Sequence, residues 1–298
     1  MDIKFLPSAD IDKVKWNSCV HYAVNGNIFG YKWYLDAVAR EWDCLIEGDY
    51  ESVLPLPYAK DWLGRKTVVQ PELMRELGVY SIHVLSQGRV KKFLEAIPKE
   101  YKKVQIDLNE QIGLPPDMDY LVAEKTNYQL LLEMPYEEIA ENYSRDLLLK
   151  LEAAEQARLR PKANLKPEKV ADFYKKHAPA SPQKEQSFHA LHRIMYNILH
   201  RGWGFAGGIE SPAGELLAVD FYIYSHSKVM RLAPVASPQG KKVGALESLT
   251  NNLIMTHAEK RMILDFNTVT DSEFAKGFGA QANVFQSIKK DERLFGVF

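Results

Sequence analysis

The chain has 298 residues, of which 46% are hydrophobic and 26% are charged, and this composition argues against a disordered protein. The 38 Lys and Arg residues nearly balance the 39 Asp and Glu residues, which argues against a strongly basic nucleic-acid-binding protein and against an acidic tail. The length allows one large domain or two domains of medium size.

The first third of the sequence predicts strands that alternate with helices. One helix is expected after Ile28-Phe29, and its apolar stripe consists of Tyr31, Tyr34, Leu35, Val38 and Trp42. Gly48-Asp49 marks a hairpin turn between two short strands. The other expected elements are strands at 44–47, 52–58, 66–70, 79–85, 104–108 and 128–132, and a helix at 89–97 that Pro98 ends.

The middle of the chain is charged and is expected to be helical. Residues 136–160 contain no Gly or Pro and are rich in Leu, Glu and Ala, which favour helix. Residues 142–176 hold nine Lys or Arg and five Asp or Glu, which makes this the most basic part of the chain. We interpret this segment as a solvated helical face, and contact with phosphate or nucleic acid is the alternative.

The last third repeats the alternation of strands and helices. One helix at 188–199 is expected to end at Gly202, and a second long helix follows residues 240–243. The expected strands are at 204–209, 216–224, 228–235, 261–267 and 283–289, with a short helix at 272–276. Both halves mix short antiparallel-type strands with helices, which predicts an α+β fold in two lobes, residues 1–135 and 136–298.

The sequence shows no secretory signal and no membrane-spanning segment. Residues 1–4 include an acidic and a basic residue where a secretory signal needs an apolar region, and the apolar run at 216–224 has about half the length of a membrane-spanning helix. A cytoplasmic protein is therefore expected. The two cysteines cannot form a four-thiolate zinc site, and His189 and His192 lie opposite the apolar stripe of their helix, so no metal site is expected.

A glycine-containing segment precedes the last long helix. Its sequence is Gln239-Gly240-Lys241-Lys242-Val243-Gly244-Ala245. Free backbone N–H groups at a helix N-terminus suit a pyrophosphate, and the two lysines add positive charge. The segment resembles the acyl-CoA-binding loop of GNAT acyltransferases, Gln/Arg-x-x-Gly-x-Gly/Ala, except that Lys242 stands at the position of the first Gly. The resemblance implies that residues 239–245 bind acyl-CoA, and a polar loop that caps a helix is the alternative.

Further short motifs are spread over nearly the whole chain. They are Ile28-Phe29, Trp33-Tyr34-Leu35-Asp36-Ala37-Val38, Leu54-Pro55-Leu56-Pro57-Tyr58, Gln70-Pro71, Gly240-x-x-x-Gly244-Ala245, Leu264-Asp265-Phe266 and Phe278-Gly279-Ala280. Together they resemble FemAB-type proteins, a branch of the GNAT superfamily with two GNAT-like lobes. The resemblance implies that each lobe is a mixed, mainly antiparallel sheet flanked by helices. Two features depart from the family: Asn267-Thr268 replace an acidic residue and Gly-Ser, and the basic stretch of the middle helix is reduced to Arg145 and Lys150.

Two carboxylates lie within apolar strands, where an unpaired charge is costly. Asp220, Tyr222 and Tyr224 share one face of a predicted strand, and Asp265 lies on a later strand. Amine acyl transfer needs a base for the attacking ammonium and an acid for the leaving group. Either aspartate could be the base, and either tyrosine could be the acid. The alternative is structural, in which Arg231 pairs with one aspartate and the tyrosines belong to the core.

The resemblance to FemAB-type proteins implies an acyltransferase-like protein that moves an acyl or aminoacyl group to an amine. The donor would be acyl-CoA if residues 239–245 bind it, or aminoacyl-tRNA if the basic middle helix binds it. The near-neutral net charge favours acyl-CoA. The acceptor would be a small-molecule or peptide amine. The alternative is a non-catalytic protein of the same fold that binds a peptide or sugar between its lobes, and Lys242 favours it.

Overall fold

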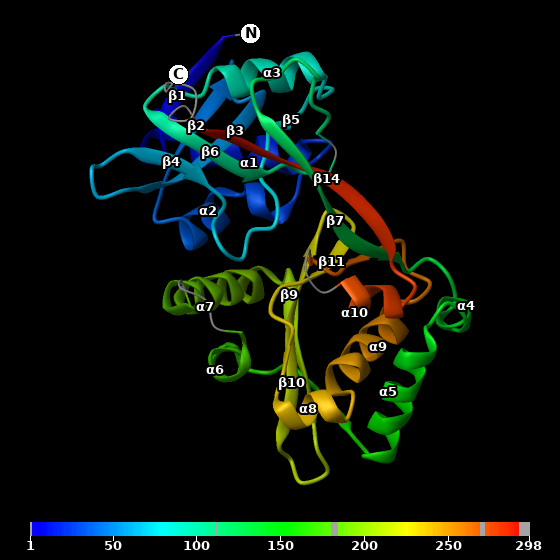
Figure 1. Cartoon of the computed structure of the whole chain (residues 1–298). Coiled ribbons are helices and arrows are strands. Elements are labelled where there is room, and N and C mark those ends of the chain that lie inside the picture. Colours follow the sequence, from blue (N-terminus) through cyan, green and yellow to red (C-terminus); the bar gives the residue numbers. More distant parts are fainter. Residues whose placement is uncertain (1, 111, 180–183, 269–271, 292–298) are drawn as a thin grey trace, which may run out of the picture. The chain divides into compact units, whose positions relative to one another are not determined.

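The computed structural model describes residues 2–110, 112–179, 184–268 and 272–291 (Figure 1). The chain forms two compact units. The first unit comprises the chain up to Thr126 together with the segment that begins at Val284, and the second comprises Asn127–Asn283. Each unit is described separately below.

The chain passes from one unit to the other within two long strands. These strands are β7 (Leu121–Leu131) and β14 (Gln281–Asp291). The second half of β14 returns to the first unit, where it pairs with β6 (Tyr101–Asp107). The division expected from the sequence, after residue 135, places this closing strand in the second lobe instead.

The sheet of the first unit is mixed and mainly antiparallel, as the sequence predicts. Its strands follow the order β1 (Ile3–Pro7), β2 (Glu41–Glu47), β3 (Ser52–Lys60), β4 (Lys66–Val69), β6 and β14. The pair β4–β6 is parallel, and the other neighbours in this order are antiparallel. The strand expected at 79–85 is only the two residues of β5 (Tyr80–Ser81), which pairs with β3.

Two of the three α-helices described in the first unit begin at a polar cap. The three helices are α1 (Lys13–Tyr22), α2 (Lys32–Val38) and α3 (Gln87–Glu95). The side chains of Asp12 and Ser86 accept hydrogen bonds from free N–H groups in the first turns of α1 and α3. The helix expected to reach Trp42 ends at Val38, because the chain then enters β2. Trp42 is buried and makes an edge contact with Trp16, their ring centroids 5.3 Å apart.

The sheet of the second unit is also mixed and mainly antiparallel. Its strands follow the order β7, β13 (Ile263–Asp265), β11 (Lys228–Arg231), β10 (Leu216–Ser225), β9 (Gly204–Glu210) and β8 (Arg160–Ala163). Only the pair β11–β13 is parallel among these described neighbours. The sequence does not predict β8, because its four residues are all exposed and include Pro161.

Helices cover both faces of this second sheet. They are α4 (Tyr136–Ala140), α5 (Arg145–Gln156), α6 (Pro167–His177), α7 (Lys184–Arg201), α8 (Pro238–Lys242), α9 (Ala245–His257) and α10 (Ser272–Gly277). Figure 1 shows α6 and α7 on one side of β9 and β10, and α5 and α9 on the other side. The single helix expected at 136–160 is divided because Ser144 caps a new helix, α5. In the described part of the chain, no helix combines the length and the apolar character needed to cross a membrane.

Candidate active site

The strand expected at 228–235 is broken into two short strands. Strand β11 runs parallel to β13 over three residue pairs, the last of which is Met230 with Asp265. The chain then bends and forms β12 (Val235–Ala236), which pairs with β10 instead. The backbone pairing of β11 with β13 therefore ends at Met230, and Asp220 and Asp265 lie near this point.

Asp220 holds the bend between β11 and β12. Its side chain is fully buried, and its Oδ1 accepts hydrogen bonds from the backbone N–H groups of Phe221 at 2.8 Å and Ala233 at 3.2 Å. Its Oδ2 accepts a hydrogen bond from Nε of Arg231 at 2.6 Å. Burial raises the pKa of Asp220, and the Arg231 guanidinium opposes that shift. The geometry therefore contains the pairing of Arg231 with an aspartate that the structural alternative expects.

Two buried donor groups beside Asp220 have no hydrogen-bond acceptor among the described residues. They are Nη2 of Arg231 and the hydroxyl of Tyr222. Tyr222 lies directly opposite Arg231 in the β10–β11 register, so both side chains extend from the same face. Burial raises the pKa of Tyr222 well above its usual value, so its hydroxyl keeps its proton at neutral pH. Unpaired buried donors are rare in proteins, and an ordered water, an ion or a catalytic role can account for them.

Asp265 belongs to a separate polar cluster at the end of β13. It is 1% exposed, and its Oδ1 accepts hydrogen bonds from Nδ2 of Asn127 at 2.9 Å and from the backbone N–H of Asn267 at 2.8 Å. Its Oδ2 accepts a hydrogen bond from Nε2 of Gln129 at 3.1 Å, and Nζ of Lys228 lies 3.7 Å away. These contacts tie the end of β13 to its neighbours β7 and β11.

Tyr224 pairs with a histidine that the sequence analysis missed. Its hydroxyl lies 2.7 Å from Nε2 of His257, and Nδ1 of His257 lies 2.8 Å from the carbonyl oxygen of Leu253. Because a carbonyl oxygen only accepts, Nδ1 carries the proton and Nε2 accepts from the Tyr224 hydroxyl. Burial lowers the pKa of His257, which favours this neutral form. The spacing of Leu249, Leu253 and His257 at every fourth position is the signal that places this histidine on the inward face of α9.

The glycine-containing segment is helical at its start. Ser237 caps α8, and the glycine at 240 in this helix packs so closely on β10 that an added Cβ would overlap the Leu217 carbonyl. Gly244 has a φ of 64° and precedes α9, and an added Cβ there would overlap the backbone carbonyl of Lys150 in α5. Both glycines therefore allow close approach of other parts of the chain. Gln239 and the two lysines are exposed, and Ala245 is buried.

A cavity of about 550 Å³ lies at the N-terminus of α9. We call it the α9 cavity, and its wall consists of Ser144, Asp146, Leu147, Lys150, Ala236, Lys241, Leu246, Glu247, Glu273, Phe274, Lys276 and Gly277. Nζ of Lys150 lies 2.5 Å from Oε1 of Glu247, which occupies the first turn of α9. Phe274 lines the cavity and also contacts the guanidinium of Arg231, with 4.7 Å between Cζ and the ring centroid. Phe274 therefore connects the wall of the α9 cavity with the Arg231 guanidinium.

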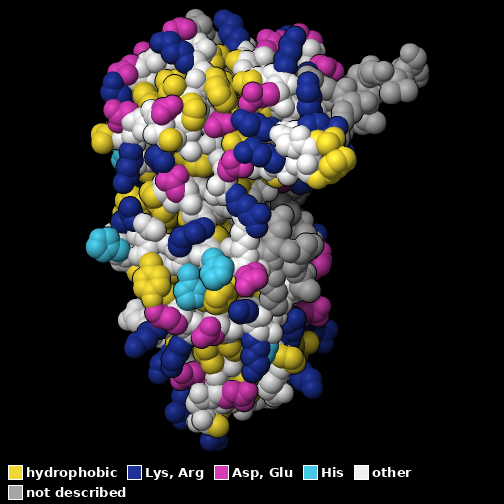
Figure 2. Space-filling model, turned by 90° about the vertical axis from the view of Figure 1, so that its left-hand side faces the viewer, with side chains coloured by type: hydrophobic (Ala, Val, Ile, Leu, Met, Phe, Trp, Pro, Cys, Tyr) yellow, Lys and Arg dark blue, Asp and Glu magenta, His cyan; other side chains and the backbone are white. Residues whose placement is uncertain are grey.

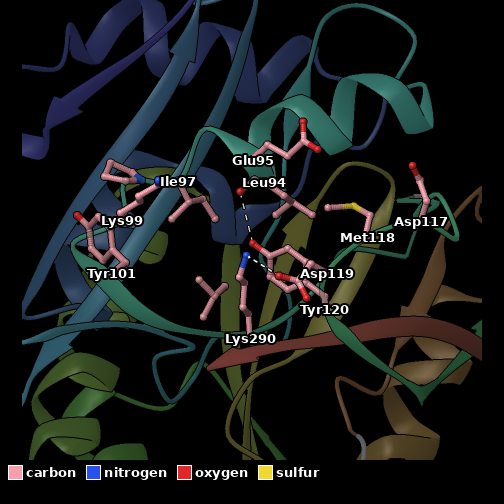
Figure 3. Close-up of a pocket in the computed structure, with 12 residues that line it drawn as sticks. Leu94, Glu95, Ile97, Lys99, Tyr101, Asp117, Met118, Asp119, Tyr120 and Lys290 are labelled. Atoms are coloured by element: carbon pink, nitrogen blue, oxygen red, sulfur yellow. Dashed lines mark hydrogen bonds and ion pairs between the residues drawn. The ribbon is translucent and has the colours of Figure 1, made fainter. Parts of the chain in front are cut away.

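The first unit contains a different kind of cavity, of about 280 Å³, below the end of α3 (Figure 3). Nζ of Lys290 lies 3.1 Å from Oδ2 of Asp119 there, and the Tyr120 hydroxyl donates a hydrogen bond to the Leu94 carbonyl oxygen at 3.4 Å. None of the site residues predicted from the sequence lines this cavity. Its ion pair is exposed to solvent on the Asp119 side.

Histidines gather on the face formed by α6 and α7 in Figure 2, where side chains of both charge signs are interspersed. Helix α7 contains His189, His192 and His200, of which His189 and His200 are exposed. Among the described residues, no group of three His, Cys, Asp or Glu side chains could hold a metal ion.

The structure thus sorts the predicted site residues into three places. Asp220 and Tyr222 meet at Arg231, Tyr224 meets His257, and Asp265 lies in its own polar cluster. Of the segment 239–245, only Lys241 lines one of the described cavities. Their predicted catalytic and cofactor-binding roles stay predictions.

Solved structures with the same fold match almost the whole chain. FemX matches at 10% identity with a TM-score of 0.65 and covers 99% of both chains. L-PGS from Bacillus licheniformis matches at 12% identity with a TM-score of 0.56, over 94% of this chain and 92% of that one. The chain has a FemX-like, GNAT-type fold. A tandem GNAT protein from the clavulanic acid biosynthesis pathway also matches, at 11% identity with a TM-score of 0.54, over 98% of this chain and 99% of that one.

These matches confirm at the level of fold the resemblance to FemAB-type proteins and the α+β class predicted from the sequence. No protein-family model matches the sequence, and no curated protein matches it. The low identities mean that the fold alone is shared, and the chemistry has to be argued from the site.

Proposed function

We propose that the protein is an acyltransferase that moves an acyl or aminoacyl group to a small-molecule or peptide amine. The observation on which this rests is the pair of buried donors, Nη2 of Arg231 and the Tyr222 hydroxyl, that have no acceptor among the described residues. When a neutral amine attacks the carbonyl carbon of the donor, a C–N bond forms and negative charge develops on the carbonyl oxygen. The bond from that carbon to the leaving group then breaks, and the leaving group takes up the proton that the amine loses. Preorganised donors in a site without water stabilise that charge, which is often the largest catalytic effect in such reactions.

In this proposal, each neighbouring side chain has one role. Asp220 positions Arg231, because both of its oxygens already accept hydrogen bonds from the protein. Tyr222 donates its proton in a hydrogen bond to the developing oxyanion. Phe274 lines the α9 cavity and contacts the guanidinium, so we place the entry of the reacting carbonyl beside its ring. The donor substrate would occupy the α9 cavity.

Tyr222→Phe provides the sharpest test of this role. The substitution removes only the hydroxyl, which has no partner among the described residues, so we expect the melting temperature to stay the same or to rise. Loss of one oxyanion donor should lower kcat by about 100-fold. Transfer of a labelled acyl or aminoacyl group to a panel of amines measures the rate, and thermal unfolding measures the stability.

Tyr34→Phe is the matched control for this test. Tyr34 is fully buried in the first unit, and its hydroxyl donates to the Leu73 carbonyl oxygen. This variant should lose about 1 kcal/mol of stability and keep its turnover. If Tyr222→Phe retains full turnover, the tyrosine is not the oxyanion donor and the proposal loses its main support.

The donor substrate is the second question. The α9 cavity is lined by three acidic and three basic side chains, and Glu247 in the first turn of α9 is already paired with Lys150. A pyrophosphate would therefore meet no net positive charge. Lys241 is the lysine of the predicted loop that could contact it, because it lines this cavity. The tandem GNAT protein with the same fold is described with reference to acetyl-CoA, which makes acetyl-CoA the first donor to test.

If acetyl-CoA is the donor, millimolar acetyl-CoA should raise the melting temperature. At ten times the dissociation constant, the ligand stabilises the folded state by about 1.4 kcal/mol, which corresponds to roughly 3 °C in a protein of this size. Lys241→Ala should reduce the shift, whereas exposed Lys242 lies outside the cavity wall and Lys242→Ala should leave it unchanged. An absent shift would exclude acetyl-CoA. Binding of aminoacyl-tRNA that weakens steeply with salt would then identify the basic segment 142–176 as the donor-binding surface.

A non-catalytic binding protein is the second candidate function. The space beside Gly244 is occupied by the backbone of α5. Both carboxylate oxygens of Asp265 accept hydrogen bonds from the protein. Both observations are expected if these residues only support the fold. Such a protein would bind a peptide or sugar without turnover. It would show ligand-dependent stabilisation in the wild type and no transfer with any donor.

A further inference from the structure

We infer that the second unit contains a separate pocket for a neutral aromatic ring of the size of benzene or indole. The pocket lies between α9 and strands β8, β9 and β10 and has a volume of about 200 Å³. We call it the aromatic pocket, and it is lined by Pro161, Lys162, Ala163, Phe205, Gly207, Gly208, Tyr222, Leu249, Asn252, Leu253, Thr256 and His257. This inference goes beyond the proposed transfer reaction and does not depend on it, although the pocket shares Tyr222 with that reaction.

The size of the pocket suits a single ring system. An engineered apolar cavity of about 150 Å³ in another protein stays free of water and binds benzene. The aromatic pocket, at about 200 Å³, has room for benzene and for the slightly larger indole. A longer acyl chain or a nucleotide would not fit within this volume.

Three ring side chains form much of the wall. The rings of Phe205 and His257 are nearly parallel, at 4°, with centroids 6.2 Å apart. The Tyr222 ring lies 4.9 Å from the Phe205 ring at an angle of 32°. Aromatic rings favour offset-stacked or edge-on contacts with one another, so these walls favour an aromatic ligand over an aliphatic one of the same volume.

The Tyr222 hydroxyl has no partner among the described residues, and the other polar side chains in the wall are engaged with the protein. The Asn252 amide donates to the Ser248 carbonyl oxygen at 2.8 Å, and the Thr256 hydroxyl donates to the Asn252 carbonyl oxygen at 2.7 Å. Both nitrogens of His257 are also used. The lining contains no carboxylate, and its one charged side chain, Lys162, lies 3.7 Å from a carboxylate oxygen of Glu210. A neutral ring therefore fits this wall better than a charged one.

Gly207 keeps the pocket open. An added Cβ at this position would lie 3.3 Å from Cδ1 of Leu249 and 3.5 Å from Cε2 of Tyr222, both of which line the pocket. A larger side chain at 207 would thus extend into the pocket. The neighbouring Gly208 differs, because an added Cβ there would come within 3.0 Å of Leu165 and would disturb the packing itself.

Binding of indole to the full-length protein tests the inference directly. We expect indole to raise the melting temperature and to give saturable binding in calorimetry. Gly207→Val should weaken indole binding at least tenfold, because the new side chain occupies the pocket. Thr256→Leu is a second variant, at an exposed position of the rim, in case the valine disturbs folding. Gly88→Ala is the control, since an added Cβ there meets nothing within 4 Å in the first unit.

Two outcomes would overturn the inference. One is the absence of indole and benzene binding by the wild-type protein, and the other is equal binding by wild type, Gly207→Val and Thr256→Leu. Tighter binding of benzoate than of indole would also contradict a pocket for neutral rings. None of these measurements requires turnover, so a failure here is distinguishable from the failure of the transfer reaction in the Tyr222→Phe test.

Discussion

Asp220→Asn is expected to lower the free energy of unfolding by about 3–5 kcal/mol, because it leaves the Arg231 guanidinium buried without its partner. Asparagine keeps one oxygen for the N–H groups of Phe221 and Ala233, but it removes the negative charge and places an NH2 donor opposite the Nε–H of Arg231. Urea unfolding at neutral pH measures the loss. The effect should be large relative to the total stability of a protein domain, which is about 5–15 kcal/mol.

The double variant Asp220→Asn with Arg231→Met is the control for this prediction, because the asparagine oxygen still accepts from the N–H groups of Phe221 and Ala233. Removing the unpaired guanidinium as well should return part of the lost stability, since a buried charge without a partner is the main cost. The double variant should still lack transferase activity, because the Arg231 donor is gone. If Asp220→Asn keeps its full stability but loses turnover, Asp220 acts on the substrate, as the sequence-based assignment of a catalytic base predicts.

The second large effect is expected at Gly244. Gly244→Ala should cost roughly 2–5 kcal/mol, because the alanine must adopt a left-handed backbone conformation and also overlap a neighbouring backbone. The φ of this residue is 64°, and the overlapping atom is the carbonyl oxygen of Lys150 in α5. A carbonyl in the middle of a helix cannot move aside as a flexible side chain can. The same urea unfolding measurement applies.

Gly214→Ala separates the two causes. Its φ of 81° is also left-handed, but an added Cβ there would meet nothing within 4 Å. This variant should therefore cost only the backbone term, about 1–2 kcal/mol. Equal losses at the two positions would mean that α5 does not press on Gly244. In that case the space beside the glycine would be open to a ligand, as the GNAT-type loop pattern implies.

Local patterns predicted most of the strands and helices of this fold. The alternation of apolar and polar residues predicted strand β10 and placed Asp220, Tyr222 and Tyr224 on one of its faces. The helical spacing of apolar residues predicted α7. The errors lie where contacts between distant segments decide the structure. Trp42 continues a helical stripe but belongs to β2, and β8 has no apolar pattern because only its backbone pairs with β9.

The candidate site was only partly predictable for the same reason. Pairing of Arg231 with an aspartate follows from strand alternation and the cost of a buried charge, and the sequence offered it as an alternative. The contact of Phe274 with that guanidinium joins segments that no local pattern connects. The glycine pattern at 239–245 was visible, but its partner, the Lys150 carbonyl, is defined only by the packing of α5.

The return of β14 to β6 constrains the order in which the protein can be assembled during synthesis. The ribosome makes β6 well before β14, and the whole of Asn127–Asn283 is translated between them. Until β14 emerges, one edge of β6 is unpaired, and its free backbone N–H and C=O groups can pair with another chain. The second unit, by contrast, is one continuous stretch and can fold as soon as it is released. The second unit is therefore free to fold first, and the first unit, although its residues are made earliest, is completed last.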